Sequence, residues 1–279
     1  MKFTLGFSPC PNDCFIFDAM IHGKIDTDGL EFESVITDVE DLNQRAFKAK
    51  LDITKLSFHA FAYVAKEYVL LHAGSALGNN CGPLLISKNN YSGAIPSIDD
   101  FKIAIPGKYT TANLLLGLYA PNAKDKVEMI FSEIEESILK GKVEAGVIIH
   151  ENRFTYQAKG LHKIVDLGEY YEDKFLHPIP LGGIVVKRTI HHDIQQKINR
   201  ILRRSVEFAF ANPDASKDFV KANSQAMDEE VMRKHIELYV NKYSIDLGVE
   251  GIKAIETLFD KASNNHLIPK ISDELFIKK

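Results

Sequence analysis

Short apolar runs alternate, along residues 1–190, with segments whose apolar residues recur at helical spacing. Runs of roughly four to eight aliphatic residues predict buried strands, and the periodic segments between them predict helices. This alternation is typical of an α/β protein with a parallel sheet covered by helices. In the first part of the chain it predicts strands at 2–7, 30–35, 51–54, 69–73 and 83–87, and helices at 12–22, 38–48 and 57–66.

The same pattern continues at smaller scale between residues 97 and 188, and beyond residue 190 the chain becomes helical. We therefore expect two lobes with a cleft between them, a favoured position for a ligand. Residues 1–92 and 187–279 would form a larger α/β domain, and residues 93–186 a smaller inserted α/β domain. The expected elements are strands at 102–105, 127–131, 145–149, 164–166 and 182–186, and helices at 111–119, 134–140, 190–211, 228–242 and 249–262.

The apolar run at 145–149 ends abruptly in His150 and three further polar residues. Small and β-branched residues in such a run predict a buried parallel strand. Ligands of open α/β sheets lie just beyond the carboxyl ends of the strands, and an imidazole exchanges protons near neutral pH. His150 is therefore a candidate for proton transfer, although a polar strand end at the surface would give the same pattern.

In three other segments, at 8–13, 54–57 and 106–111, a strand leads through a tight polar loop into a helix. A helix start exposes unpaired N–H groups and the positive end of the helix dipole, so each start is a potential carboxylate site. Ser57, Thr110 and Thr111 add hydroxyls at these starts, where they also serve as ordinary caps. His59 follows Ser57 and is a weaker candidate, since a packed position would explain it.

The composition excludes several classes of partner. The net charge is −4, and Lys and Arg residues are scattered, so we expect neither nucleic acid nor an anionic membrane as a partner. No apolar run approaches the roughly 18 residues that a membrane helix needs, and the first segment is too short for a signal-peptide core. Three cysteines fit a reducing compartment, and we expect a cytoplasmic protein.

The sequence predicts no metal and no cofactor. Cys10 and Cys14 are four residues apart, but no second Cys/His pair follows at zinc-site spacing. Two small side chains packed in a turn and a first helical turn explain them better. The chain contains no glycine-rich phosphate-binding loop of the dinucleotide or Walker type, so we expect no nucleotide cofactor.

Four separated motifs, in this order, resemble the 1,4-dihydroxy-6-naphthoate synthase family of the futalosine route to menaquinone. The resemblance covers nearly the whole chain, including Tyr239, Val240 and Asn241. Cys14, where Thr is expected, and Asn152, where Ser is also familiar, are small departures. The four motifs are residues 6–13 (GFSPCPND), 54–57 (TKLS), 106–111 (PGKYTT) and 148–156 (IIHENRFTY).

This resemblance implies an α/β, two-lobed fold like that of type II periplasmic binding proteins, used by a cytoplasmic enzyme without a cofactor. It implies a lyase that cleaves cyclic dehypoxanthine futalosine into 1,4-dihydroxy-6-naphthoate and a three-carbon sugar fragment. The family's proton acceptor falls on His150, which would act as general base. The substrate contacts that the family implies fall on Lys55, Leu56, Ser57, Thr110 and Thr111.

Two alternatives remain open at this stage. A non-catalytic binding protein of the same fold would capture a small carboxylate, but it would normally carry a targeting segment. The sister chorismate dehydratase of the same pathway would share the fold, and the motif around His150 argues against it. In each case the expected partner is a small molecule with a carboxylate, and a monomer and a homodimer both remain possible.

Overall fold

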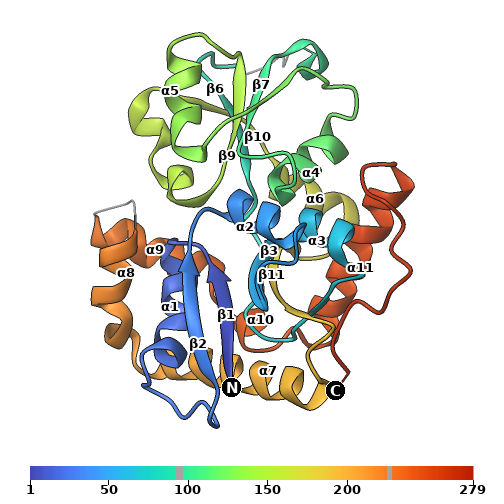
Figure 1. Cartoon of the computed structure of the whole chain (residues 1–279). Coiled ribbons are helices and arrows are strands. Elements are labelled where there is room, and N and C mark those ends of the chain that lie inside the picture. Colours follow the sequence, from blue (N-terminus) through green and yellow to red (C-terminus); the bar gives the residue numbers. More distant parts are fainter. Residues whose placement is uncertain (92–96, 225–227, 279) are drawn as a thin grey trace.

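Two β-sheets, one above the other, form the centres of two lobes in the computed structural model (Figure 1). The structure describes residues 1–91, 97–224 and 228–278. The larger sheet has the strand order β2, β1, β3, β11, β4, and β5 also pairs with β11. Its strands are β1 (Lys2–Phe7), β2 (Glu31–Ile36), β3 (Ile53–Ser57), β4 (Tyr68–Leu70), β5 (Ala76–Gly78) and β11 (Ile179–Lys187).

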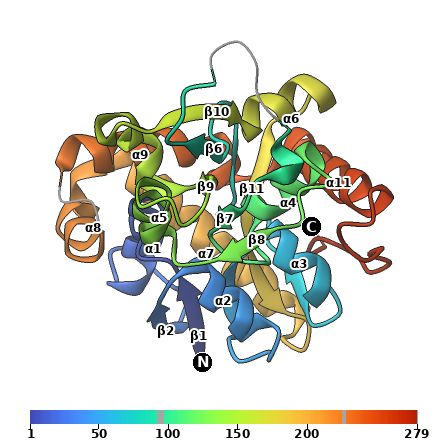
Figure 2. The same ribbon diagram turned by 90° about the horizontal axis from the view of Figure 1, so that it is seen from above.

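The smaller sheet has the order β10, β6, β9, β7, β8, and these strands follow one another across the view from above in Figure 2. Within it, β9 pairs with β7 in parallel and with β6 in antiparallel orientation. The prediction of a parallel strand at 145–149 is therefore correct only towards β7. The expected parallel sheet is wrong in the larger sheet too, because β11 pairs antiparallel with β3, β4 and β5. The strands are β6 (Leu84–Ser87), β7 (Ile103–Ile105), β8 (Lys126–Glu128), β9 (Ala145–Ile148) and β10 (His162–Asp166).

The structure has every predicted helix, with boundaries that differ by a few residues, and it adds helices at Leu167–Phe175 and Lys217–Asn223 that the sequence did not predict. The predicted helix at 228–242 is divided, because Asn241 caps a new short helix with both bonds of a capping box. The helices are α1 (Pro11–Ile21), α2 (Val39–Ala46), α3 (Phe58–Val64), α4 (Thr111–Tyr119), α5 (Ile134–Leu139), α6 (Leu167–Phe175), α7 (His192–Ala211), α8 (Lys217–Asn223), α9 (Glu229–Tyr239), α10 (Lys242–Ile245) and α11 (Gly248–Asn264).

The larger sheet has an apolar cluster on each side. On one side, Phe7 of β1 packs with Phe17 of α1, in a cluster that also contains Leu202 of α7. On the other side, Phe58 of α3 packs against Phe259 of α11. Burial of one such side chain contributes about 1.5–3 kcal/mol to stability. The two clusters therefore hold the larger sheet, and with it the ends of β1 and β3 near the pocket, in place.

The two sheets divide the chain at points other than the predicted boundaries at residues 92 and 186. Strand β6 belongs to the smaller sheet and β11 to the larger one, so the chain crosses between sheets at 79–83 and again at 167–178. Strand periodicity does not reveal this, because pairing partners are distant in the sequence. The division into domains itself stays a prediction.

The two crossings touch each other. A Cβ on Gly82 would lie 2.3 Å from the Cα of Gly168, so both positions require glycine. Arg153 donates hydrogen bonds to the Gly82 carbonyl and to Asp166, and the Asp166 carboxylate accepts from the Gly168 N–H at 2.8 Å. Both passages of the chain between the lobes are therefore held at one place.

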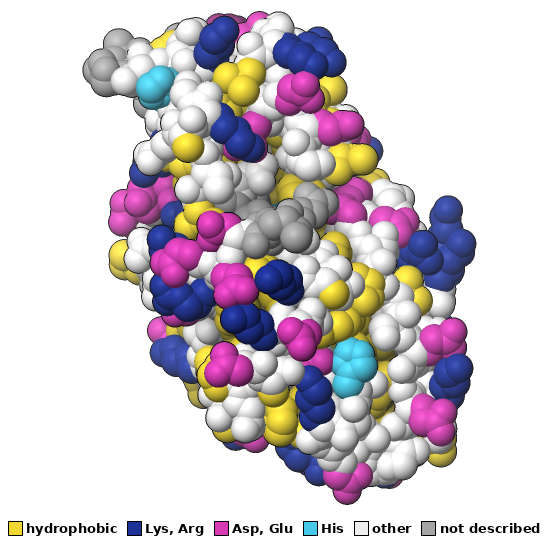
Figure 3. Space-filling model, turned by 90° about the vertical axis from the view of Figure 1, so that its left-hand side faces the viewer, with side chains coloured by type: hydrophobic (Ala, Val, Ile, Leu, Met, Phe, Trp, Pro, Cys, Tyr) yellow, Lys and Arg dark blue, Asp and Glu magenta, His cyan; other side chains and the backbone are white. Residues whose placement is uncertain are grey.

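The surface carries charges of both signs. On the face shown in Figure 3, Lys and Arg side chains lie interspersed with Asp and Glu side chains. In the described part of the chain, no helix combines the length and apolar character that crossing a membrane requires. This surface is consistent with the small net charge of the sequence.

Candidate active site

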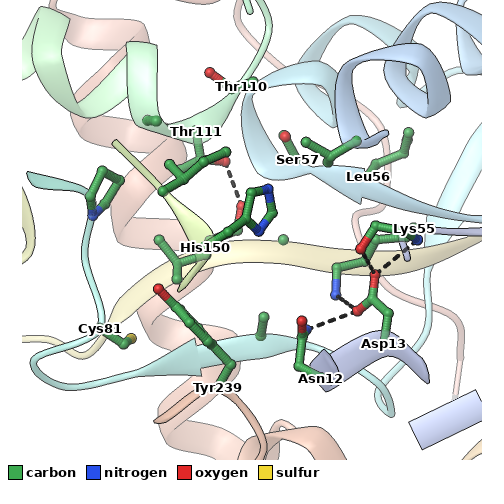
Figure 4. Close-up of a pocket in the computed structure, with 18 of the residues that line it drawn as sticks. Asn12, Asp13, Lys55, Leu56, Ser57, Cys81, Thr110, Thr111, His150 and Tyr239 are labelled. Carbon is green, nitrogen blue, oxygen red and sulfur yellow. Dashed lines mark hydrogen bonds and ion pairs between the residues drawn. The ribbon is translucent and has the colours of Figure 1, made fainter. Parts of the chain in front are cut away.

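A pocket lies between the two lobes, with a volume of about 680 Å³ including its open mouth (Figure 4). Its walls come from the loop after β1, the end of β3, the start of α4, the residues after β9, part of β11, and α9. The structure brings all six site residues expected from the sequence to this one pocket. They are Lys55, Leu56, Ser57, Thr110, Thr111 and His150.

His150 begins a 3-10 turn directly after β9 and has a φ of +58°. This left-handed conformation is uncommon for a residue with a Cβ, and it is typical of functional positions. The ring projects into the pocket (Figure 4). Its edge packs against Phe131, with ring centroids 4.6 Å apart. The imidazole therefore lies at the pocket and is held from one side by an apolar ring.

Cys10 lies 3.1 Å from Nδ1 of His150, measured from its Sγ. It is the residue before α1, and Pro11 occupies the first helical position. The expectation that Cys10 merely packs in a turn is therefore incomplete, because it contacts the candidate base. Cys14 does pack as expected: it is fully buried, and burial raises the pKa of its thiol.

A buried ion pair between Lys55 and Asp13 lines the pocket (Figure 4). Lys55 Nζ lies 2.7 Å from Oδ1 of Asp13, and the two side chains are 7% and 1% exposed. Asp13 is in the first turn of α1, where the helix dipole favours a carboxylate. It also accepts hydrogen bonds from the Ser8 N–H, the Ser8 hydroxyl and the Asn12 side-chain amide. Each oxygen of the Asp13 carboxylate thus accepts from two donors.

Ser57 ends β3, three residues beyond the predicted strand end, and its side chain makes no capping bond to α3. The expected role of its hydroxyl as a cap is therefore wrong. Asn43 of α2 holds it instead: the Ser57 N–H donates to Asn43 Oδ1 at 3.1 Å, and the Asn43 amide donates to the Ser57 hydroxyl at 3.3 Å. This arrangement fixes the hydroxyl at the wall of the pocket.

The two threonines at the start of α4 use their hydroxyls for the protein itself. Thr110 caps the helix by accepting from the Asn113 N–H, and it donates to the Gly107 carbonyl at 2.8 Å. Thr111 donates to the Leu181 carbonyl of β11 at 2.5 Å. What this helix start offers a ligand is therefore its backbone, because N–H groups of a first turn have no acceptor within the helix.

His59 is packed, as the simpler of its two interpretations predicts. It is buried, and its Nδ1–H donates to the Thr110 carbonyl at 3.1 Å. Burial lowers the pKa of His59 to about 4 from a usual value of 6.5. His59 therefore stays neutral at physiological pH and supports the loop before α4.

The low pKa of His59 should make the stability of the protein depend on pH. The unfolded chain binds a proton at His59 between about pH 6.5 and 4 while the folded chain does not, so the free energy of unfolding falls as the pH falls through this range. His59→Gln keeps a donor for the Thr110 carbonyl and removes the titration. We expect the free energy of unfolding in urea to fall less between pH 7 and pH 4 in this variant than in the wild type. An equal loss in both proteins would contradict the assignment.

Sequence reasoning missed two further groups of pocket residues. Asn12 and Asp13 fall within a predicted helix start, but nothing singles out their contacts with Lys55. His235 lies on the buried face of α9 with Met232 and Tyr239. The spacing of these three residues, at i, i+3 and i+7, marks one apolar helix face, and a histidine on such a face was the available signal.

The arrangement resembles no metal centre. Within residues 1–91, 97–224 and 228–278, no group of three or more His, Cys, Asp or Glu side chains is placed to hold a metal ion. The pocket instead offers an imidazole, an ammonium group and several hydrogen-bond donors, which suit an anionic, hydroxyl-bearing organic molecule.

Cys81, near the first crossing between the sheets, also lines the pocket. It is buried, and burial raises the pKa of its thiol to about 12.

Known structures with this fold confirm the two-lobed expectation. A solved structure from Archaeoglobus fulgidus superposes with a TM-score of 0.90 at 36% identity, covering 96% of this chain and 98% of that chain. An alkanesulfonate-binding protein from Xanthomonas axonopodis pv. citri has a TM-score of 0.69 at 14% identity, covering 96% and 94%. The fold is therefore that of periplasmic-binding-protein-like proteins.

Sequence comparison is more specific. A "1,4-dihydroxy-6-naphtoate synthase" from Thermus thermophilus is 40% identical over 273 residues, 98% of this chain and 98% of the relative. One of the same name from Streptomyces coelicolor is 37% identical over 275 residues, covering 97% and 96%. The family model described as "Menaquinone biosynthesis" matches residues 3–264. The chain therefore belongs to the menaquinone biosynthesis family that includes the 1,4-dihydroxy-6-naphthoate synthases.

Proposed function

We propose that the protein is a carbon–carbon lyase that converts cyclic dehypoxanthine futalosine into 1,4-dihydroxy-6-naphthoate and a three-carbon sugar fragment. The names of its relatives support the product. The observation that carries the chemistry is the His150 imidazole, which lines the pocket and has Nδ1 next to Cys10. The cleavage needs no electron acceptor, because it is redox-neutral, and formation of the aromatic ring provides much of the driving force.

The contact with Cys10 selects a tautomer of His150 in this proposal. If Nδ1–H donates to the Cys10 sulfur, Nε2 keeps its lone pair and can accept a proton. Nε2 takes the proton of a substrate hydroxyl, and the O–H electron pair becomes the second bond of a carbonyl. The adjacent carbon–carbon bond breaks as in a retro-aldol reaction. Its electron pair passes to the ring portion, which becomes aromatic after proton exchange with His150 or solvent.

The other pocket residues bind the substrate in this proposal. The first turn of α4 supplies N–H groups and a positive dipole end for the aromatic carboxylate. Ser57 supplies a hydroxyl, and Leu56 an apolar surface. Lys55 directs one N–H bond to Asp13, which leaves the ammonium group further donors for a negatively charged oxygen. The Lys55 ammonium group would thereby stabilise the charge that develops when His150 removes the proton.

The direct test is incubation of the purified protein with cyclic dehypoxanthine futalosine, followed by chromatographic detection of the naphthoate. We expect the wild type to release it and the His150→Ala variant to bind substrate without releasing it. A wild-type protein that binds the substrate but leaves it intact would indicate a binding protein of the same fold. Turnover of chorismate in a parallel assay would instead indicate the sister dehydratase.

Ser57 provides a prediction about binding. Ser57→Ala removes the hydroxyl but leaves the backbone bond from Ser57 N–H to Asn43 in place. We therefore expect KM to rise several-fold while kcat changes little, because loss of uniform binding raises KM alone. Steady-state kinetics measure both values. A fall in kcat at constant KM would contradict the binding role. Thr111→Ala is a poorer test, since it also removes the bond to the Leu181 carbonyl.

A further inference from the structure

His235 lines the pocket, but the reaction described above assigns it no role. It lies on the buried face of α9 and is 1% exposed. Among the residues that the structure describes, neither Nδ1 nor Nε2 of this ring has a hydrogen-bond partner. Because a buried polar group without a partner costs free energy, two such atoms in a pocket wall point to a ligand as their partner.

The surroundings of His235 place it at the reacting end of the pocket. Its ring is nearly parallel to that of His150, at an interplanar angle of 21°, and the ring centroids are 6.3 Å apart. Tyr239 lies on its other side, at 4.6 Å between centroids. Helix α9 packs against the 3-10 turn His150–Phe154. A substrate atom that reaches the His150 ring therefore passes close to His235.

The charge state of His235 narrows the class of ligand group. Burial, together with the nearby His150 and Lys55, lowers the pKa of His235 well below its usual range. A neutral imidazole presents one donor and one acceptor. A hydroxyl group suits either ring nitrogen, because it can accept from the N–H or donate to the other nitrogen. A carboxylate only accepts, and it would favour a protonated ring that this environment opposes.

We propose that His235 binds an uncharged hydroxyl of the substrate and so holds its sugar-derived end against His150. The inference rests on the proposed function, because it takes the substrate to carry hydroxyls at one end and a carboxylate at the other. The carboxylate lies at the start of α4 and the hydroxyl-bearing end at α9. In this arrangement His235 orients the substrate so that its sugar-derived end lies next to His150.

Two substitutions test this assignment by steady-state kinetics with cyclic dehypoxanthine futalosine. His235→Phe fills the same space without polar atoms, and we expect it to raise KM roughly tenfold, the loss of one hydrogen bond. We expect its Tm to equal or exceed that of the wild type, since no unpaired buried nitrogen remains. His235→Gln keeps a donor and an acceptor and should recover part of the lost affinity.

His72 provides a matched control. It is also buried, but it lies outside the pocket lining, and its Nε2 pairs with the Ile277 carbonyl at 3.0 Å. His72→Phe should lower Tm and leave KM unchanged. A KM within twofold of wild type in His235→Phe would overturn the inference. So would a His235→Phe variant that loses Tm while His235→Gln keeps wild-type KM, because the ring would then serve packing alone.

The same assays separate this inference from the proposed function. If the wild type releases no naphthoate, both are rejected. If the wild type turns over normally and the His235 variants keep wild-type KM, only the role of His235 is rejected. A raised KM in His235→Phe with partial recovery in His235→Gln supports both.

Discussion

Replacement of His150 by alanine is expected to lower kcat by about 10²–10⁴-fold, the usual contribution of a positioned general base. The reason is geometric: the ring lines the pocket, and Phe131 and Cys10 hold it from the protein side. Turnover is measured as naphthoate released at saturating substrate. Binding should persist, because alanine removes the proton acceptor without touching the start of α4 or Ser57.

His162 offers a control for this variant. It lies on β10 of the same lobe and is absent from the pocket lining, so His162→Ala should keep wild-type turnover. Circular dichroism and thermal unfolding should show that His150→Ala remains folded. A kcat within tenfold of wild type in His150→Ala would remove this residue from the mechanism.

Removal of Asp13 is expected to destabilise the fold by about 3–5 kcal/mol, as is typical when one partner of a buried ion pair is lost. Asp13→Ala leaves the Lys55 ammonium group without its carboxylate and also frees the donors of Ser8 and Asn12. Urea unfolding monitored by circular dichroism measures the change. Lys55→Met should cost less, because the Asp13 carboxylate retains three other donors.

The double variant Asp13→Leu/Lys55→Met distinguishes a stranded charge from general disruption. Since it removes both charges, it should be more stable than Asp13→Ala. Lys242→Ala, which breaks an exposed pair with Glu250, should leave the unfolding midpoint unchanged. If Asp13→Ala unfolds at the wild-type midpoint, the ion pair contributes nothing to stability and serves the ligand alone.

Much of the architecture follows from local patterns in the sequence. The strand at Lys2–Phe7, the capped helix after Asp38 and the stop at Asn212 are local features, and the structure has each of them. The gathering of the motifs around one pocket follows from a general property of α/β sheets, whose strand ends meet at one edge. His150 follows β9 of the smaller sheet and Lys55 lies on β3 of the larger one, so the two residues line one pocket only because the two sheets face each other across it.

Non-local pairing explains what the sequence did not reveal. The assignment of β6 to the smaller sheet and of β11 to the larger one depends on partners far away in the chain. The contacts of Ser57 depend in the same way on Asn43, which belongs to another helix. His235 looks from the sequence like one more residue on an amphipathic helix, and only the fold places its ring beside His150.

The contact between Gly82 and Gly168 has a mechanical consequence. Because both passages of the chain between the lobes meet there, any hinge in the chain between the lobes would lie at this contact. Rotation about such a hinge would carry His150 with the upper lobe and Lys55 with the lower one, so the width of the pocket and the distance between these side chains would change together. Any change in the angle between the lobes would therefore alter the spacing of the proton acceptor and the ammonium group as well as the access to the pocket.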